Sequence, residues 1–122
     1  KHIIEVEDVY LDECEDLLTM LKSEDRPTAI VVSDDILAVS LERVCMQCGL
    51  SIPEDISIIS FNDSLFAKLT HPPLTSINVN SSQLGIEAAS QLINHIENPN
   101  LVATKIIVPH SLVERESCRR IR

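Results

Sequence analysis

The sequence of 122 residues has no tryptophan and only three aromatic residues, so its core must be built mostly from aliphatic side chains. It is also poor in basic residues: 10 Lys and Arg stand against 19 Asp and Glu, which gives a formal net charge of −9 at pH 7. Nucleic-acid binding requires clustered Lys and Arg that displace counterions from phosphates. Direct contact between this chain and DNA is therefore not expected.

Long apolar runs are absent as well. No run approaches the roughly 18 apolar residues that a membrane span needs, and no apolar segment of the secretory type opens the chain. The chain starts at Lys1 without a methionine, which suggests that upstream sequence has been removed, so the missing signal segment is uninformative. With 44% apolar residues, we expect one globular domain or a part of one.

Motifs that support catalysis are also missing. The sequence has no Gly-rich phosphate loop, no Gly-x-Ser-x-Gly elbow and no nucleophile with a nearby base. Cys45 and Cys48 have the spacing of a redox or zinc pair, but the last turn of a helix opposes a thiolate, and no second pair completes a zinc site. We predict structural, reduced cysteines, no metal, no cofactor and no enzymatic activity.

The segment from Gly49 to Asn62 organises the chain. Gly49 and Pro53 mark the end of a helix, because glycine commonly closes helices and proline cannot continue them. Ile56–Phe61 then forms an apolar run of strand length, which is typical of a central strand buried on both faces. Polar residues follow from Asn62 onward. In parallel α/β sheets ligands bind at this carboxyl edge.

The remaining elements alternate between strands and helices. The expected elements are an edge strand at Ile3–Val6, a helix at about Leu11–Glu24, a buried strand at Thr28–Ser33, a helix from Asp34 to Gly49, a helical turn at Leu65–Leu69, a strand at Leu74–Val79, a helix capped by Ser81 or Ser82 and ending at Glu97, and strands at Lys105–Val108 and Leu112–Glu116. This order predicts a doubly wound, mostly parallel α/β sheet.

Two polar pairs, Asp34-Asp35 and Asn62-Asp63, follow adjacent predicted strands. They have two interpretations. One is the acidic, magnesium-holding corner of a phosphoaccepting receiver domain, although the lysine that such a domain needs at the end of a later strand is missing, since Lys105 begins its strand. The other interpretation is helix capping and turn formation.

Several segments together resemble the lactose-repressor/galactose-repressor (LacI/GalR) family of bacterial transcription regulators. The resemblance rests on Pro27–Ile30, Asp34-Asp35 with Ala38, Gly49-Leu50 with Ile52–Ser57, Phe61–Asp63, Pro72–Ile77, Leu84-Gly85 with Ala88-Ala89, and Leu112–Ser117. It covers residues 27–117, with the segments in the order and spacing of the family.

The resemblance implies an incomplete, carboxyl-terminal portion of an effector-binding core with a type I periplasmic-binding-protein-like fold. Residues 1–80 would form the carboxyl-terminal subdomain without its first strand and helix. Residues 81–108 would be a helix and strand that belong to the amino-terminal subdomain in the family, and residues 109–122 a return strand and tail. The apolar stripe of residues 81–108 would then lack its usual partners.

The resemblance also implies site residues. Asp34 and Asn62 match positions that contact a small sugar-like effector. Val79 stands where some members place a polar contact, and Tyr10 is the nearest substitute for an aromatic platform. An amide at position 62, where the family usually has Asp, still suits a neutral, hydroxyl-rich ligand.

Dimerisation is the other implied property. The family's dimer surface maps to the helix after Asp34 and to the segment from Ser64 to His71. The implied interface residues are Val39, Arg43, Leu65, Phe66 and Leu69, which would explain a helix that is apolar on two sides. The alternative is that these residues pack within one subunit.

The function implied is that of the sensor and dimerisation segment of a cytoplasmic repressor, which would contact operator DNA only through an amino-terminal headpiece absent from this chain. An exported sugar-binding receptor of the same fold is the alternative. The cysteines and the segments Pro72–Thr75 and Leu112–Ser117 favour the repressor.

Overall fold

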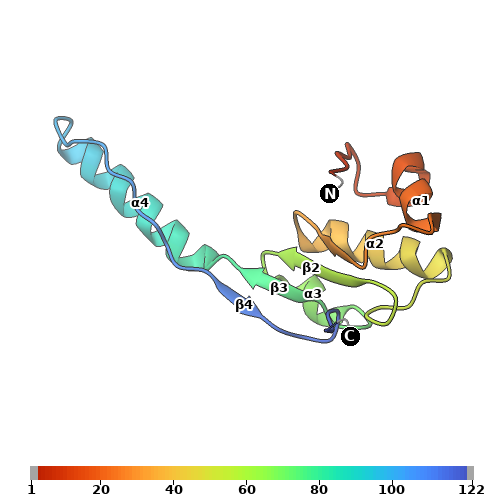
Figure 1. Ribbon diagram of the computed structural model, residues 1–122. Coiled ribbons are helices and arrows are strands. Elements are labelled where there is room, and N and C mark those ends of the chain that lie inside the picture. The colour runs from red at the N-terminus through yellow and green to blue at the C-terminus, as the bar shows by residue number, and fades with distance from the viewer. Residues whose placement is uncertain (1–2, 121–122) are drawn as a thin grey trace.

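The computed structural model describes residues 3–120 and contains a four-stranded α/β sheet (Figure 1). The strands are β1 (Ala29–Val31), β2 (Ser57–Phe61), β3 (Thr75–Asn78) and β4 (Ser111–Val113), in that order across the sheet. The first three strands are parallel and β4 is antiparallel to β3. The mostly parallel sheet predicted from the sequence is confirmed.

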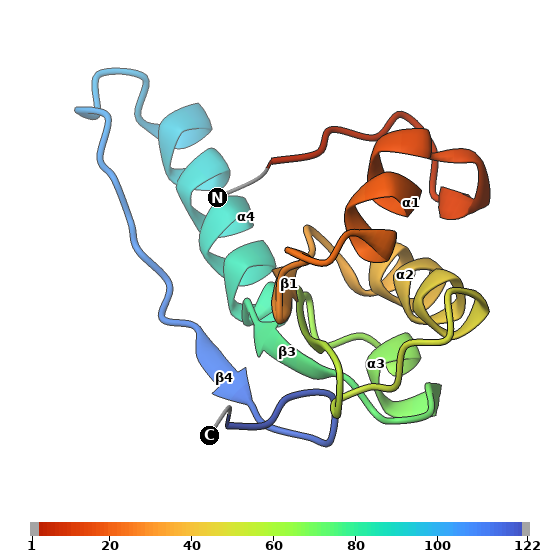
Figure 2. The same cartoon turned by 45° about the vertical axis from the view of Figure 1, so that its right-hand side comes forward.

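The helical elements are η1 (Leu11–Glu13), α1 (Glu15–Lys22), α2 (Asp35–Gln47), α3 (Leu65–Leu69) and α4 (Ser81–Glu97). Figure 2 shows α1, α2 and α3 on the same side of the strands, and α2 contacts β2, α3 and η1. None of the helices within residues 3–120 is long and apolar enough to cross a membrane.

An aliphatic core lies between α2 and the sheet, as the scarcity of aromatic residues predicts. The buried apolar residues are Leu11, Leu17, Leu21, Val32, Ala38, Leu41, Val44, Cys45, Ile56, Ile58, Ala67 and Leu74. On the other face of the sheet, Val31 and Leu112 are 68% and 52% exposed. The described helices that pack on the sheet therefore cover one of its faces.

The boundaries of α2 follow the sequence closely. The Asp34 carboxylate caps the amino end by accepting a hydrogen bond of 2.9 Å from the backbone N–H of Leu37. After Gln47 the chain turns at Gly49, whose φ of 76° lies in the left-handed region that glycine adopts without steric cost. Both predicted signals, the acidic cap and the closing glycine, are confirmed.

The predictions for the peripheral strands are wrong. Residues 3–6 are extended but pair with no strand in the described chain, although Ile4 and Val6 pack against the core. Residues 105–108 also form no strand, and the strand expected at Leu112–Glu116 is the shorter β4. A strand exists only where a neighbour takes up its hydrogen bonds, and residue pattern alone does not specify that neighbour.

Two other predictions need correction. The strand expected to be buried at Thr28–Ser33 is the shorter β1, which lies at the edge of the sheet and exposes Val31. The cap position of α4 is Asn80, with a φ of 54°, while Ser81 is already the first helical residue. Asparagine tolerates this left-handed conformation better than most residues.

The helix α4 forms an arm that extends away from the sheet (Figure 1). None of its residues is buried. The segment that returns to β4 runs along it, and Thr104, Ile106 and Val108 line a shallow pocket together with residues of α4. The arm exposes several large apolar side chains, namely Leu84, Ile86, Leu92, Ile93 and Ile96.

We predict that the backbone amides of α4 exchange with solvent much faster than those of α2. An isolated helix of this length is marginally stable in water, whereas α2 is held by packing on the sheet. Hydrogen–deuterium exchange with mass spectrometry should give α4 protection factors below about ten, because a helix whose only described packing is against one exposed segment is barely stable. Equal protection of the two helices would show that another surface covers α4.

Candidate functional site

Three predicted effector contacts converge on one edge of the sheet. Asp34, Asn62 and Val79 follow β1, β2 and β3, and because these strands are parallel, their carboxyl ends meet at the same edge. Asp34 and Val79 are half-buried and Asn62 is exposed. The edge therefore carries a carboxylate, an amide and an apolar side chain just after the ends of three neighbouring strands.

The backbone around Asn62 fixes how this edge is presented. Asn62 has a φ of 98°, and its N–H donates a hydrogen bond of 2.9 Å to the carbonyl oxygen of Ile77 on β3. The next residue, Asp63, also has a positive φ. Two successive left-handed residues turn the chain sharply after β2, and this leaves the Asn62 side chain at the surface.

Asp63 anchors this turn. Its carboxylate forms an ion pair with Arg115 and accepts a hydrogen bond of 3.0 Å from the Asn78 amide. Burial raises the pKa of Asp63, but the bonds from Arg115 and Asn78 outweigh it and hold the pKa below its usual value. The charged form therefore persists at neutral pH and connects β2, β3 and the segment after β4.

Tyr10 does not lie at this edge of the sheet, but near the segment that packs beside the middle of α2. It is 70% exposed and directly precedes η1. The N–H of Leu11 donates to the Ser40 hydroxyl at 3.2 Å, and Asp12 forms an ion pair with Arg43. These contacts hold η1 against the middle of α2, about two turns from the end where Asp34 lies. The role of Tyr10 as an effector platform stays a prediction.

Asp35 has a role that the sequence analysis missed. Its side chain is 1% exposed, and its carboxylate accepts hydrogen bonds from the Ser60 hydroxyl at 2.5 Å, the Ser64 N–H at 2.6 Å and the Ser76 hydroxyl at 2.8 Å. This residue joins the start of α2 to β2, β3 and the loop before α3. The available signal was the serine at position 60, between Ile59 and Phe61 in the apolar run of β2.

These bonds keep Asp35 ionised. Burial alone raises the pKa of the carboxyl, but the hydrogen bonds from Ser60, Ser64 and Ser76 stabilise the carboxylate and bring the pKa below its usual value. Asp35 and Asp63 are thus both committed to bonds within the protein. Capping and turn formation explain the acidic pairs without the phosphate chemistry of a receiver domain.

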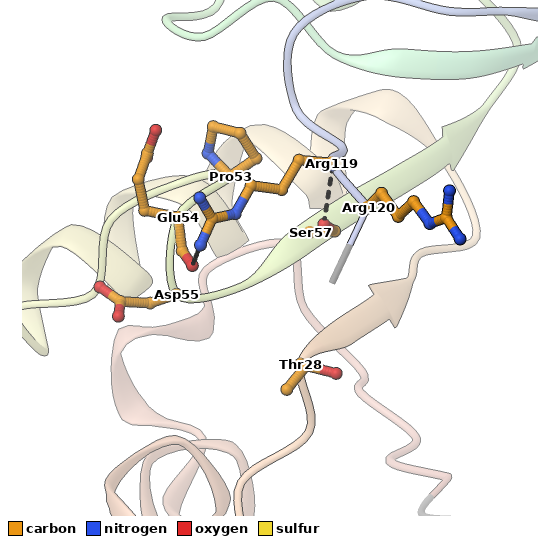
Figure 3. Close-up of a pocket in the computed structure, with 7 residues that line it drawn as sticks. All are labelled: Thr28, Pro53, Glu54, Asp55, Ser57, Arg119 and Arg120. Atoms are coloured by element: carbon orange, nitrogen blue, oxygen red, sulfur yellow. Dashed lines mark hydrogen bonds between the residues drawn. The ribbon is translucent and has the colours of Figure 1, made fainter. Parts of the chain in front are cut away.

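A polar pocket lies at the opposite edge of the sheet, where Thr28 precedes β1 and Ser57 begins β2 (Figure 3). Arg119 points toward Glu54 and donates to its carbonyl oxygen at 2.6 Å, while Arg120 points away. The Arg119 N–H also donates to the Ser57 hydroxyl at 3.2 Å. These contacts attach the end of the chain to the sheet, and the two guanidinium groups do not converge on one point.

The predicted dimer residues gather in a groove between α2 and α3, here called the α2–α3 groove. It is lined by Val39, Glu42, Arg43, Met46, Phe66, Leu69, Thr70 and His71. Four of the five predicted interface residues are in this set, and the fifth, Leu65, is 67% exposed on α3. Phe66 and Leu69 are 50% and 70% exposed, which is unusual for such large apolar side chains placed side by side.

The cysteines are free thiols. Cys45 is fully buried, and burial raises its pKa to about 12, so it stays an unreactive thiol at neutral pH. This agrees with the structural role predicted for the Cys45 and Cys48 pair.

Comparison with protein families matches residues 4–118 to the periplasmic binding protein-like domain. The chain is 41% identical over 99 residues to the arabinose metabolism transcriptional repressor of Geobacillus stearothermophilus, a match that covers 80% of this chain and 27% of the relative. It is 30% identical over 102 residues to a lactose operon repressor of Rhizobium radiobacter, covering 84% and 89% of the two chains. The chain therefore spans little more than a quarter of the length of the arabinose repressor.

Solved structures give the same relationship. A transcriptional regulator LacI from Bacillus cereus subsp. cytotoxis NVH 391-98 superposes with a TM-score of 0.81 and 36% identity, over 84% of this chain and 36% of the other. The Lac repressor dimer bound to operator and an anti-inducer, ONPF, gives a TM-score of 0.75 and 28% identity, over 85% and 36% of the chains.

We predict that Asp35→Asn destabilises the fold by about 2 to 4 kcal/mol, because an amide cannot accept all three hydrogen bonds and places an N–H against a donor. The neighbouring Asp34→Asn is the matched control and should cost less than about 0.5 kcal/mol, since asparagine caps helices as well as aspartate. Urea unfolding at pH 7 measures both.

The lowered pKa of Asp35 also predicts how the destabilisation by Asp35→Asn depends on pH. The pKa of Asp35 is lowered in the folded state, so its stabilisation is present above the unfolded value of about 3.9 and is lost as pH falls through the folded pKa. The difference in the free energy of unfolding between the unmodified chain and Asp35→Asn should become smaller below about pH 4. A gap that stays constant down to pH 2 would contradict the ionised state of Asp35.

Proposed function

Because this chain belongs to the LacI/GalR family of transcriptional regulators and consists mainly of its periplasmic binding protein-like domain, we propose that it is the effector-sensing and dimerisation segment of a sugar-responsive repressor. The observation that carries this proposal is the convergence of Asp34, Asn62 and Val79 at the carboxyl edge of the parallel sheet. Its relatives are repressors, which does not favour the exported-receptor alternative.

The chemistry of the edge suits a small, neutral, hydroxyl-rich effector. Asp34 uses one carboxylate oxygen to cap α2, and the other lies 3.4 Å from the Ser33 hydroxyl, so it can accept a further hydrogen bond. The Asn62 amide can both donate and accept. The arabinose and lactose systems named for its relatives support a sugar as the class of effector.

We further propose that the effector acts by closing two subdomains. The arm formed by α4 and residues 101–108 would belong to the other subdomain, and its exposed apolar side chains would then pack there. Closure would alter the dimer and thus the spacing of DNA-binding headpieces. The effector can shift this equilibrium only by binding one arrangement more tightly than the other.

The α2–α3 groove is the proposed homodimer surface. The exposed apolar side chains of α3 and Met46 of α2 support this, because a monomer gains nothing by leaving them in water. A relative of the same fold is a dimer bound to operator. Such a repressor would act in the cytoplasm, which is consistent with four free thiols.

We predict that Asn62→Gly in the intact protein weakens effector binding by about 1 to 3 kcal/mol, or roughly 5- to 150-fold, because a buried hydrogen bond to the sugar is lost. Glycine is chosen since it accepts the left-handed backbone at this position. Isothermal titration with a panel of pentoses, hexoses and disaccharides identifies the effector first and then compares the variants.

Asn98→Gly, at the far end of α4, is the control for this comparison and should leave the affinity unchanged. If Asn62→Gly binds as tightly as the unmodified protein, Asn62 lies outside the effector site.

We predict that Leu69→Asp disrupts the dimer, because a buried, unpaired carboxylate costs several kcal/mol. Sedimentation velocity should show the dimer dissociation constant rising by at least about a hundredfold. Both variants are compared in this chain, where Leu92 is 63% exposed, and Leu92→Asp on α4, an equally drastic change, should have no such effect. Equal responses of the two variants would exclude the α2–α3 groove as the dimer surface.

A further inference from the structure

An unsatisfied carboxyl group lies in the α2–α3 groove. Glu42, in the middle of α2, is 5% exposed although it lines the groove. Its Oε1 atom is buried and has no hydrogen-bond partner among the described residues. Burying a polar atom without a partner is costly, so such an atom is expected to acquire a partner or lose its charge when the protein is assembled.

The groups around Glu42 do not neutralise it. The adjacent Arg43 is directed to Asp12 of η1, with which it forms an ion pair. The strand β2, which packs under α2, has no titratable residue. The remaining titratable groups of α2, of the elements packed against it and of the groove are Asp35 and Cys45 on α2 itself, Glu13 on η1, Lys68 on α3 and His71 after α3. Asp35 is occupied by its bonds to Ser60, Ser64 and Ser76.

The apolar surroundings destabilise the charged form of Glu42. Burial raises its pKa to about 7, so both protonation states are populated near neutral pH before any partner is present. Four of the side chains that line the groove with it, Val39, Met46, Phe66 and Leu69, are apolar and offer no charge to a carboxylate. Removing water from the groove would therefore disfavour the ionised form further.

We propose that the groove is closed by a second copy of this chain and that Glu42 enters the interface as the neutral acid, so that each subunit whose Glu42 is ionised takes up a proton on association. This inference rests on the proposed dimer surface and adds a pH dependence to it. A twofold interface is self-complementary, so the partner contributes the same exposed apolar residues of α3 and a second Glu42. Two chains that each carry a net charge of −9 also repel less when these carboxyls are neutral.

The sign of the effect follows from linkage. A group whose pKa is higher in the dimer than in the monomer favours the dimer most below the monomer value, and the gain is lost as pH rises through the value in the dimer. With two Glu42 side chains, the dissociation constant can rise by up to about a hundredfold per pH unit in that window. The dimer should therefore be tight at pH 6 and weaker at pH 8.5.

Sedimentation velocity of the full chain at pH 6 and pH 8.5, at constant ionic strength, tests the proposal. The unmodified chain should dissociate at least about tenfold more readily at pH 8.5. Glu42→Gln should remove most of this dependence and dimerise at pH 8.5 as it does at pH 6, and Glu42→Leu should behave in the same way. Circular dichroism checks that the variants are folded.

Two control variants distinguish Glu42 from other charges. Glu97→Gln, at the end of α4, removes the same charge from an exposed position remote from the groove and should keep the pH dependence of the unmodified chain (Figure 1). His71→Gln removes the histidine of the groove and should also keep the pH dependence of dimerisation. If His71→Gln loses the pH dependence of dimerisation and Glu42→Gln retains it, the proposal is wrong.

The remaining outcomes separate the inference from the function on which it rests. A dimer that Leu69→Asp disrupts, but whose affinity is the same at both pH values, overturns the role of Glu42 and leaves the dimer surface intact. A chain that is monomeric at every pH, or a dimer that Leu69→Asp does not disturb, overturns the dimer surface and this inference with it.

Discussion

The fold depends on one buried carboxylate. Asp35 begins the helix that covers the sheet, and its three hydrogen bonds reach β2, β3 and the loop before α3. A buried ionised group is tolerated only when its acceptor capacity is used, and here hydroxyl and backbone donors converge on it from three separate segments. The register between α2 and the carboxyl edge of the sheet is therefore set by a polar contact that permits few alternatives, while the aliphatic core beneath supplies non-directional stability.

The same edge that Asp35 holds together also presents the candidate site. Asp34, one residue earlier, caps the helix with one of its carboxylate oxygens. Asn62 follows the strand whose Ser60 donates to Asp35. Asp63, fixed by Arg115, sets the turn in which Asn62 lies. In each pair the less exposed residue, Asp35 or Asp63, holds the backbone through bonds within the protein, and the more exposed residue is the one proposed to contact the effector. Such a rigid support lowers the conformational entropy lost on binding.

How far the sequence predicts this structure depends on whether each signal is local. The helix α2, the strand β2 and the turn α3 follow from capping, apolar runs and a closing glycine, all of which lie within a few residues. Strand pairing is not local, and so the strands expected at residues 3–6 and 105–108 were wrong. The convergence of Asp34, Asn62 and Val79 was predictable, because parallel strands share a carboxyl edge. The bonds of Asp35 to residues 25 to 41 positions away were not, since a serine in a strand does not identify its partner.

Two of the apolar surfaces in the described part of the chain, the α4 arm and the α2–α3 groove, differ in the kind of partner that would cover them. The arm of α4 exposes several aliphatic side chains and has no buried polar atom without a partner among the described residues, so an apolar surface of suitable shape lowers its free energy. The α2–α3 groove is more selective, because it combines apolar walls with the unpaired oxygen of Glu42. A partner that seals the groove must either donate a hydrogen bond to that carboxyl or accept it in its neutral form. Hydrophobic burial can therefore supply the affinity of both surfaces, and in the groove the proposed protonation of Glu42 would make that affinity depend on pH.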